Sequence, residues 1–538
     1  MTEKEVEGLQ LALQLRAKGL IRTTQPPFAE SREKEIKGLL DRGIFEIVNI
    51  GDVPTGTRIF NSRFVDDIKG KDTDTPYEKS RLVIQAHNDI EKKKVLTQSP
   101  TIQRSSQRLI LSLAMVKNEM TLNTRDISQA YVQSNTNLNR VFYARPPKEL
   151  KLEGVVLQVL KPLYGVPESG THWFRTYHNH HTANLGLVQS TYDPCLLYGP
   201  NAVVGLQTDD TLFLADTSYI RKEDDELKRA GYTAKPITTL VLGHDVTFNG
   251  GNISLQSDGS IKLTQPRQCQ NICLINTSAT DTNIRTQYIK ERARGAYIAS
   301  MCQPEAAFKL SFAAQISEPT KDDVAYLNKV LKWQQQHATR GLTFIRLLPE
   351  ELKLMVFVDA SFANNKDLSS QIGFVIVMAT ETREENTIQI QGNIIHWSST
   401  KCKRITRSVL ASELYAMVAG FDMGSAISST VKGILLAIEN HADMPLIICT
   451  DSYSLYDCMI KLGTTAEKRL MIDIMGLRQS YERREISEVR WIDGECNPAD
   501  AMTKDQPGQA LRTLIDTNRL QLTTKGWVER KGSGDWVE

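Results

Sequence analysis

The stretch Leu206-Gln-Thr-Asp-Asp-Thr-Leu-Phe-Leu214 places two adjacent aspartates, Asp209 and Asp210, between two apolar arms. Arms rich in β-prone residues around a short polar tip are typical of a β-hairpin. Taken alone, the tip fits an ordinary polar turn best, because Asp is common in turns. It also fits a cation site, because side-by-side carboxylates repel each other and hard oxygen ligands suit Mg²⁺. The rest of the chain must decide between these two interpretations.

The composition excludes several classes of protein. The chain has 538 residues, the length of three or four domains, and its 41% hydrophobic and 24% charged residues are usual for a soluble globular protein. The net charge is +2, so any nucleic-acid contact must come from local basic patches. The eight cysteines form no CxxC pair, which argues against zinc and disulfide frameworks and fits a reducing compartment. No signal peptide and no apolar run of membrane-spanning length is visible, so we expect no membrane partner.

A third carboxylate, Asp126, follows a short predicted strand at 120–123. Because the ends of neighbouring strands meet in a packed sheet, Asp126 and the hairpin pair could converge. Three carboxylates at one sheet edge can hold two divalent ions, which activate an attacking hydroxyl and stabilise a leaving pyrophosphate. Phosphoryl transfer needs mainly such positioning and charge neutralisation. Lys79 and Arg81, on an earlier predicted strand, could grip a triphosphate, although this basic pair taken alone fits a solvated strand face better.

The second half of the chain carries a separate acidic set in a predicted βββαβαβα pattern. Its members lie at strand ends or on a flanking helix: Asp359, Glu413, Asp451 and Asp500. The long helix predicted at 408–439 would lay Glu413 over the sheet, near two strand-end aspartates. Four carboxylates on one sheet edge suit two Mg²⁺ ions that activate water against a phosphodiester. One such acid would fit a surface residue, but four in this element order favour a metal site.

Two basic runs and one histidine cluster lie outside these sets. Four cations just before the Glu413 helix could grip the phosphates of a nucleic acid: Lys401, Lys403, Arg404 and Arg407. We expect such recognition to use backbone and A-like shape, with little sequence specificity. The run 92–94, with Arg104 and Arg108 on the next helix, fits a nucleic-acid contact or a solvated face equally well. The four histidines of the predicted helix at 170–185 fit structural roles better than a metal site, because no carboxylate accompanies them.

The motifs stand in the order found in copia-type (Pseudoviridae) LTR retrotransposon Pol polyproteins, and the chain resembles their reverse transcriptase and ribonuclease H regions. The first part of the match, from about 60 to 342, rests on Lys79-Ser-Arg-Leu-Val83, Arg125-Asp-Ile-Ser-Gln-Ala-Tyr131, Lys161-Pro-Leu-Tyr-Gly165, Tyr192-Asp-Pro194 and Thr208-Asp-Asp210. The second part, from about 352 to 504, rests on Val358-Asp-Ala-Ser361, Ser408-Val-Leu-Ala-Ser-Glu-Leu-Tyr415, Thr450-Asp-Ser452 and Asn497-Pro-Ala-Asp-Ala-Met-Thr-Lys504. The ordered set is far more specific than any one motif.

The resemblance implies an α+β multidomain fold, in which a fingers–palm–thumb reverse transcriptase precedes an α/β ribonuclease H-like domain with a five-stranded mixed sheet. It implies two Mg²⁺ ions in each active site, with Mn²⁺ as a substitute. The polymerase ligands would be Asp126, Asp209 and Asp210. The nuclease ligands would be Asp359, Glu413, Asp451 and Asp500.

The resemblance also implies roles for five residues around the incoming nucleotide. Lys79 and Arg81 would contact the triphosphate of the deoxynucleotide. Tyr131 would be the aromatic gate that clashes with a ribose 2′-hydroxyl. Tyr164 and Gly165 would lie near the templating base pair.

The expected domains are an N-terminal extension at 1–40, fingers and palm at 41–263, a helical thumb or tether at 264–350, a ribonuclease H-like domain at 351–510 and a C-terminal tail at 511–538. The implied partners are an RNA template, a DNA primer, an RNA–DNA hybrid and deoxynucleoside triphosphates. The implied location is intracellular, in cytoplasmic virus-like particles or in the nucleus. We find no zinc-knuckle, integrase or protease motif. We therefore expect capsid, protease and integrase components for transposition and DNA integration to be separate or cleaved proteins, and the chain to be the C-terminal part of a polyprotein.

The chain departs from the family pattern at three places. Gln207-Thr208 stand where the family has Tyr-Val, and Cys302-Gln303 replace Thr-Arg. The loop Gly494-Glu-Cys496 lacks the histidine that some ribonucleases H place before the last acid, so product release would use another group. Three hypotheses stay open: a bifunctional polymerase and nuclease, a degenerate or domesticated fragment that binds nucleic acid without polymerising, and a working nuclease beside an inactive polymerase.

Overall fold

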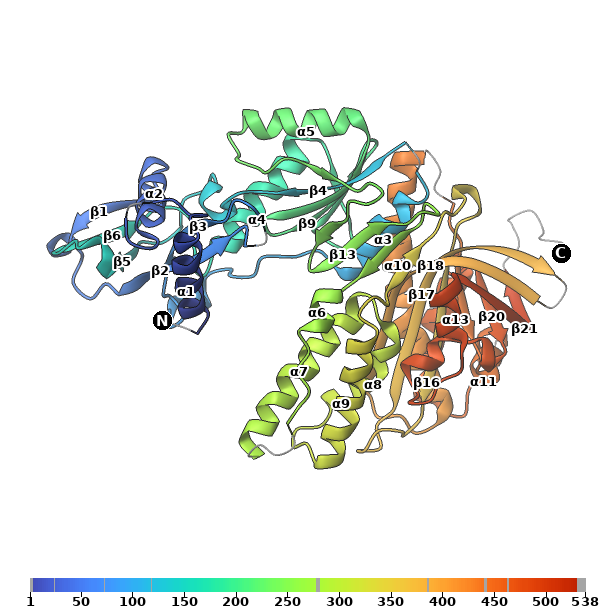
Figure 1. The fold of residues 1–538 in the computed structure, drawn as a ribbon. Helices are drawn as coiled ribbons and strands as arrows, with labels where there is room; N and C mark the ends of the chain where they lie inside the picture. The colour runs from blue at the N-terminus through green and yellow to red at the C-terminus, as the bar shows by residue number, and fades with distance from the viewer. Residues whose placement is uncertain are drawn as a thin grey trace. The chain divides into compact units, whose positions relative to one another are not determined.

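The computed structural model describes residues 3–23, 25–71, 73–117, 119–276, 281–384, 387–439, 443–461 and 464–529 (Figure 1). They form two compact units. The first comprises 1–101, 126–186 and 224–235, and the second comprises 102–125, 187–223 and 236–538. Neither unit is one continuous segment, because the chain passes between them at both ends of 126–186 and of 224–235.

The first unit is built on a five-stranded sheet in the order β1-β6-β5-β2-β3. Its strands are β1 (Phe45–Asn49), β2 (Ile59–Lys69), β3 (Tyr77–Ile84), β5 (Phe142–Arg145) and β6 (Val155–Val159), and its helices are α1 (Glu3–Ala17), α2 (Ala29–Asp41) and α4 (Ser169–Asn179). Apolar side chains of the sheet and of α2 form the core, where Phe60 and Phe142 stack with ring centroids 4.4 Å apart. The β2–β3 hairpin places Lys79 and Arg81 on a strand, as predicted.

The second unit begins with a six-stranded sheet in the order β11-β4-β10-β9-β8-β7. Its strands are β4 (Thr121–Asp126), β7 (Val188–Gln189), β8 (Leu196–Gly199), β9 (Ala202–Gln207), β10 (Asp210–Ala215) and β11 (Thr238–Thr239). Helix α3 (Arg104–Ala114) packs against β9 and β10, and α5 (Thr217–Arg229) follows β10. The opening stretch of sequence is therefore the β9–β10 hairpin, with Gln207 paired to Asp210.

A smaller sheet and a helical group come next in the second unit. The sheet has the order β12-β13-β14-β15, with β12 (Val246–Phe248), β13 (Gly251–Leu255), β14 (Ile261–Thr264) and β15 (Leu342–Phe344). Between its last two strands the chain forms α6 (Pro266–Gln270), α7 (Asp281–Met301), α8 (Ala307–Ala314) and α9 (Lys321–Gln336). Helices α7, α8 and α9 pack side by side around their own apolar core (Figure 1).

The last part of the second unit is a closed sheet in the order β16-β17-β18-β21-β20-β19. Its strands are β16 (Lys353–Ser361), β17 (Gln371–Glu384), β18 (Thr387–Lys401), β19 (Leu446–Thr450), β20 (Glu488–Ile492) and β21 (Arg519–Glu529). Its helices are α10 (Val409–Glu439), α11 (Tyr453–Ile460), α12 (Met471–Glu482) and α13 (Ala510–Thr517). Strands β16, β19 and β20 are parallel and β17 and β18 are antiparallel to their neighbours, so the predicted mixed sheet is present.

The sequence predicted five strands where the structure has six, and residues 511–529 of the predicted tail form a helix and a strand. Residues 510–517 form α13, and β21 pairs with both β18 and β20. The physical reason is visible in the sequence: Leu520, Leu522 and Thr524 are buried while the residues between them are exposed, the period-two pattern of a half-buried strand. The final residues, 530–538, lie outside the described part of the chain.

Helix α10 lies across β16 and β17, and two glycines bring it close to the sheet (Figure 1). A Cβ atom at Gly420 or Gly424 would lie 2.7 Å from the side chain of Val358 or Val356, respectively. By length and composition α10 is the one described helix that could cross a membrane, but 44% of its most apolar window is buried inside the protein. Because α10 packs against the sheet, its apolar composition is that of a helix in a protein core.

Arg108, one candidate for nucleic-acid contact, is instead buried in the second unit. Its Nε donates to the carbonyl of Ile395 at 2.7 Å, and its Nη1 donates to that of Ser300 at 2.9 Å. Its guanidinium also lies 4.0 Å from the ring centroid of Trp397. Through these hydrogen bonds Arg108 joins α3 to α7 and β18. Both predicted roles, a nucleic-acid contact and a solvated face, need an exposed side chain and are therefore wrong for Arg108.

A buried ion-pair network ties the closed sheet together. Arg490, fully buried on β20, donates to Glu381 of β17 at 2.7 Å and to Glu488 at 2.8 Å. Lys353 of β16 also contacts Glu381, at 2.7 Å. Burial alone raises the pKa of Glu381, but hydrogen bonds and charge from Arg490 and Lys353 outweigh it, and the pKa falls to about 2.

We expect Glu381→Gln to lower stability by about 3 kcal/mol at pH 7, because it leaves the guanidinium of Arg490 buried without its main counter-charge. Since the folded pKa of Glu381 is depressed, its contribution is complete above the ordinary carboxyl pKa and is lost as the pH falls toward about 2. Thermal unfolding of the two proteins from pH 7 to pH 2 measures this difference. The exposed Glu384→Gln on the same strand is the control, and equal shifts for both substitutions would contradict the role of the network.

Candidate active sites

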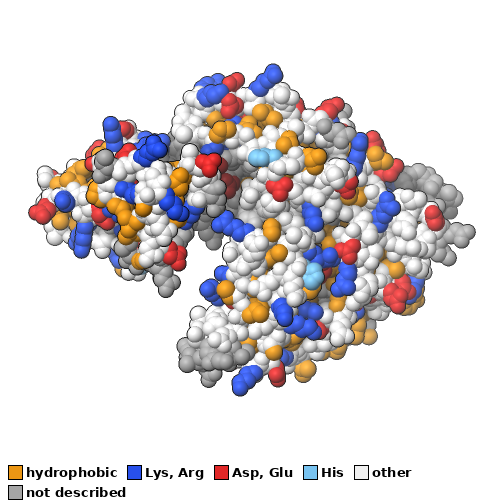
Figure 2. Space-filling view, viewed as in Figure 1, with side chains coloured by type: hydrophobic (Ala, Val, Ile, Leu, Met, Phe, Trp, Pro, Cys, Tyr) orange, Lys and Arg blue, Asp and Glu red, His pale blue; other side chains and the backbone are white. Residues whose placement is uncertain are grey.

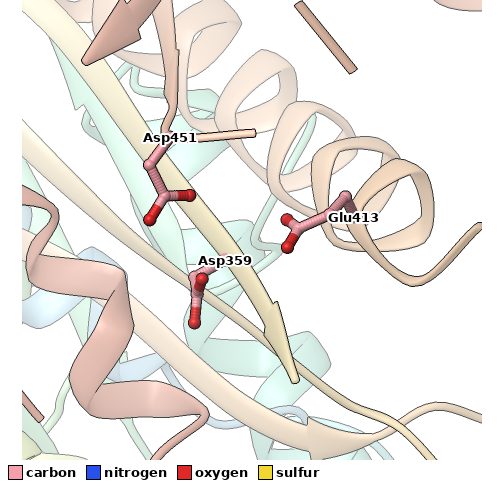
Figure 3. A group of neighbouring side chains, drawn as sticks. All are labelled: Asp359, Glu413 and Asp451. Carbon is pink, nitrogen blue, oxygen red and sulfur yellow. The ribbon is translucent and has the colours of Figure 1, made fainter. Parts of the chain in front are cut away.

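Three carboxylates gather at one end of the closed sheet. Asp359 lies on β16, Glu413 lies in the first turns of α10, and Asp451 follows β19 directly. One oxygen of each lies within 4.8 Å of the others, and Figure 3 shows the three side chains pointing toward one shared space. Among the described residues, these form the one cluster of His, Cys, Asp or Glu with ligand atoms this close.

The electrostatics of this cluster fit a bound divalent cation. Burial, followed by repulsion from Asp451, raises the pKa of Asp359 to about 7. Burial and repulsion from Asp359 and Asp451 raise the pKa of Glu413 well above its usual range. The Oε2 of Glu413 is also buried without a hydrogen-bond partner. A buried, mutually repelling and incompletely satisfied set of oxygens is the donor set that Mg²⁺ prefers.

The fourth predicted acid, Asp500, lies in the 3₁₀ helix η10 (Pro498–Met502) and is held by its own chain. Its Oδ2 accepts a hydrogen bond from the backbone N–H of Gly508 at 2.9 Å, and its Oδ1 forms an ion pair with Lys504. The charge of Lys504 also lowers the pKa values of Asp359 and Asp451, against the larger effect of their burial. Lys504 therefore supplies positive charge to the cluster, a role that the sequence analysis did not assign.

One close approach and two hydrogen bonds position this site. A Cβ atom at Gly373 of β17, which pairs with Asp359, would lie 2.3 Å from the Cβ of Met502, so only glycine lets η10 reach the sheet. The side chain of Asn497 donates to the carbonyl of Val358 at 2.9 Å, and the hydroxyl of Thr503 donates to Asp359. The motif at 497–504 is thus a docking segment as well as the source of one acid.

The first unit brings together the residues implied for nucleotide binding. The guanidinium of Arg81 lies 5.5 Å from the ring centroid of Tyr164, whose ring lies 5.5 Å from that of Tyr131. Gly165 has a φ of 85°, and a Cβ there would lie 1.9 Å from the carbonyl oxygen of Ile84. Burial, followed by the charge of Arg81, lowers the pKa of Lys79. Residues far apart in the sequence therefore form one cationic and aromatic surface beside the end of β3.

The three predicted polymerase carboxylates belong to different units. Asp126, the last residue of β4, is in the first unit, where its Oδ2 accepts a 2.6 Å ion pair from Lys235. Asp209 and Asp210 are in the second unit, at the tip of the β9–β10 hairpin and at the start of β10. Their grouping around one metal centre stays a prediction. The sequence predicts no role for Lys235, because no motif surrounds it and its partner Asp126 is distant along the chain.

The unusual pair before the hairpin aspartates has a structural signature. Thr208 has a φ of 56°, a left-handed conformation that is strained for a β-branched residue. The side-chain oxygen of Gln207 is buried without a hydrogen-bond partner. The two residues that depart from the family pattern thus combine a strained backbone with an unsatisfied side-chain oxygen at the hairpin.

The basic run at 401–407 follows β18 and leads into α10. Lys401 forms an ion pair with Asp367, and Arg404 forms one with Asp473 at 2.9 Å. Lys403 and Arg407 are exposed and have no acidic partner among the described residues.

Figure 2 shows Lys and Arg side chains interspersed with acidic ones on the visible face, in keeping with the net charge of +2.

Comparison with known proteins shows which proteins the chain is similar to. The family model described as reverse transcriptase (RNA-dependent DNA polymerase) matches residues 45–289. The Transposon Ty1-DR5 Gag-Pol polyprotein of Saccharomyces cerevisiae is 23% identical over 532 residues, which cover 91% of this chain and 29% of that protein. The Truncated transposon Ty1-A Gag-Pol polyprotein of the same yeast is also 23% identical, with 91% and 42% covered.

These matches support the predicted resemblance to copia-type retrotransposon Pol polyproteins. The chain spans less than a third of the length of the first of these relatives. Two solved structures of a foamy viral protease-reverse transcriptase, one in complex with dsDNA and one with RNA/DNA hybrid, each give a TM-score of 0.46. Their sequence identities are 16% and 14%, and they cover 89% and 90% of this chain and 92% and 60% of their own chains.

We expect Asp359→Asn to have opposite effects on stability with and without Mg²⁺. In metal-free buffer at pH 8 it removes a repelling buried charge, so the unfolding midpoint should rise by about 2–4 °C, or about 1 kcal/mol. Added Mg²⁺ should raise the midpoint of the unsubstituted protein, because a ligand that binds only the folded state stabilises it, and should raise that of Asp359→Asn much less. Differential scanning fluorimetry measures both, with Glu485→Gln as an exposed control. An equal Mg²⁺ response in Asp359→Asn would contradict the metal site.

Proposed function

We propose that this chain is an RNA-directed DNA polymerase with a linked ribonuclease H-type activity on RNA–DNA hybrids. The observation that carries the polymerase is the match of residues 45–289 to the reverse transcriptase family. The observation that carries the nuclease is the buried cluster of Asp359, Glu413 and Asp451 at one end of the closed sheet. RNA template, DNA primer and deoxynucleoside triphosphates are the corresponding partners.

In the proposed polymerase, Asp126, Asp209 and Asp210 are the metal ligands. Lys79 and Arg81 bind the triphosphate of the incoming nucleotide, and the stacked position of Tyr164 beside Arg81 fixes that guanidinium. Tyr131, next to Tyr164, excludes a ribose 2′-hydroxyl by its ring. Gly165 supports this surface because no other residue allows the loop to approach β3 so closely.

In the proposed nuclease, Asp359, Glu413, Asp451 and Asp500 hold the metal. When bound, two Mg²⁺ ions would activate water and neutralise charge on the scissile phosphate. The chain itself concentrates negative charge at that point and shields it from bulk solvent. Lys403 and Arg407, just before α10, bind the phosphates of the hybrid. Since the loop before Asp500 has no histidine, Lys504 is the cation that stands closest to the last acid.

A second candidate is a working nuclease beside an inactive polymerase. The strained backbone at Thr208 and the unsatisfied oxygen of Gln207 favour it, because both residues precede the hairpin aspartates. The nuclease cluster shows no comparable departure among its acids. The two activities must therefore be measured separately.

For the polymerase, we expect Asp209→Asn to lower Mg²⁺-dependent primer extension on poly(rA)/oligo(dT) by about 10²–10³-fold, since it removes a ligand from phosphoryl transfer. Asp225→Asn, an exposed acid on α5, is the control and should extend primers normally. If the unsubstituted chain fails to extend primers while it still cuts a hybrid, the polymerase proposal fails and the second candidate stands.

For the nuclease, Glu413→Gln should reduce cleavage of a labelled RNA–DNA hybrid by about 10²–10³-fold and leave primer extension unchanged. The exposed Glu485→Gln is the matched control and should cut at the rate of the unsubstituted protein. Cleavage that persists in Glu413→Gln would show that this cluster is not the nuclease site.

A further inference from the structure

A cavity of about 410 Å³ lies between the helices α8 and α9 and the segment that follows Asp500. One wall comes from α9, where Tyr326, Lys329 and Trp333 are spaced three and four residues apart and so share one helix face. The opposite wall comes from residues 501–512. All these residues belong to the second unit, and the volume falls in the usual range for small-ligand pockets.

The acids that line the cavity are already engaged. Asp505 accepts a 2.7 Å hydrogen bond from the hydroxyl of Tyr326 and lies 3.9 Å from the ammonium of Lys309. Glu305 forms an ion pair with Arg340. By contrast, Lys329 and Arg512 are exposed and have no acidic partner within ion-pair distance among the residues that the structure describes. The cavity therefore presents uncompensated positive charge.

Aromatic side chains define the rest of the ligand. Phe308, Tyr326 and Trp333 line the cavity, and its exposed lining is mainly apolar. Cations beside aromatic rings suit an anion with a planar, stackable body, whereas a simple phosphate or an aliphatic acid would leave the rings unused. A nucleotide combines the two features, with its base against the rings and its phosphate against Lys329 and Arg512.

We propose that this cavity binds a single nucleotide unit, either free or at the end of a single strand. The site is distinct from the nuclease carboxylates but touches the same segment. Lys504 lines the cavity and pairs with Asp500, and Gly508 lines it and donates its N–H to Asp500. A bound nucleotide would hold the segment 504–508 and with it the position of Asp500.

Binding can be tested in EDTA, where neither proposed activity operates, with adenosine 5′-monophosphate, a 12-nucleotide single-stranded DNA and inorganic phosphate as probes. Isothermal titration should show binding of the nucleotide that weakens about tenfold in Trp333→Leu and in the double variant Lys329→Gln/Arg512→Gln. Lys321→Gln, an exposed cation at the start of α9 outside the cavity, is the matched control and should bind normally. Thermal midpoints of all variants establish that they fold.

The probes separate the two sources of the ligand. If the DNA competes with the mononucleotide and the same substitutions weaken it, the ligand is a strand end. If the DNA does not compete, the ligand is a free nucleotide. If phosphate binds as tightly as the nucleotide, or if none of the substitutions in the cavity weakens binding, the proposal is overturned. Hybrid cleavage is assayed separately with Mg²⁺, so a failure of the proposed nuclease leaves this test unaffected.

Discussion

Repulsion between buried carboxylates is the constraint on which the closed-sheet part of the second unit depends. Asp359, Glu413 and Asp451 come from a strand, a helix and the end of a second strand. The fold holds them together although burial raises the pKa of each, and repulsion within the cluster raises those of Asp359 and Glu413 further. Such an arrangement costs free energy unless positive charge enters it. Lys504 provides part of that charge from within the chain, through its ion pair with Asp500. In the first unit, Lys235 stands in the same relation to Asp126.

Helix α10 connects the carboxylate cluster to the sheet that contains the β9–β10 hairpin. Its first turns carry Glu413, and its second half meets that sheet, where the hydroxyls of Thr430 and Ser190 lie 2.9 Å apart. A Cβ atom at Gly433 would lie 2.6 Å from the hydroxyl oxygen of Tyr198, so a side chain there would push the Tyr198 ring aside. The hairpin aspartates and the carboxylate cluster consequently belong to one compact unit, in which the buried Arg108 makes a further connection.

The sequence indicated which acids of the closed sheet lie close together, but it did not indicate their surroundings. The assignment of these acids to a metal site stays a prediction. Acids at strand ends were predictable because strand ends and element order are local signals, and Asp359, Glu413 and Asp451 meet as expected. The burial of Arg108 was not predictable, because its partners are carbonyl groups nearly 200 and 300 residues away, and carbonyl groups leave no mark in a sequence. The role of Lys504 could have been inferred from its place four residues after Asp500, just past the 3₁₀ helix that carries Asp500.

Strand β21 also carried a readable signal, the alternation from Leu520 to Thr524, but it follows the last acidic motif and was assigned to a tail. Its position has a consequence for how the molecule can be divided. Because β21 lies between β18 and β20, a chain that stops before Arg519 would leave two strands with unpaired backbone groups. Unpaired sheet edges recruit strands from other molecules. A fragment trimmed after the acidic motif at 497–504 would thus keep every acid of the cluster and still be prone to self-association.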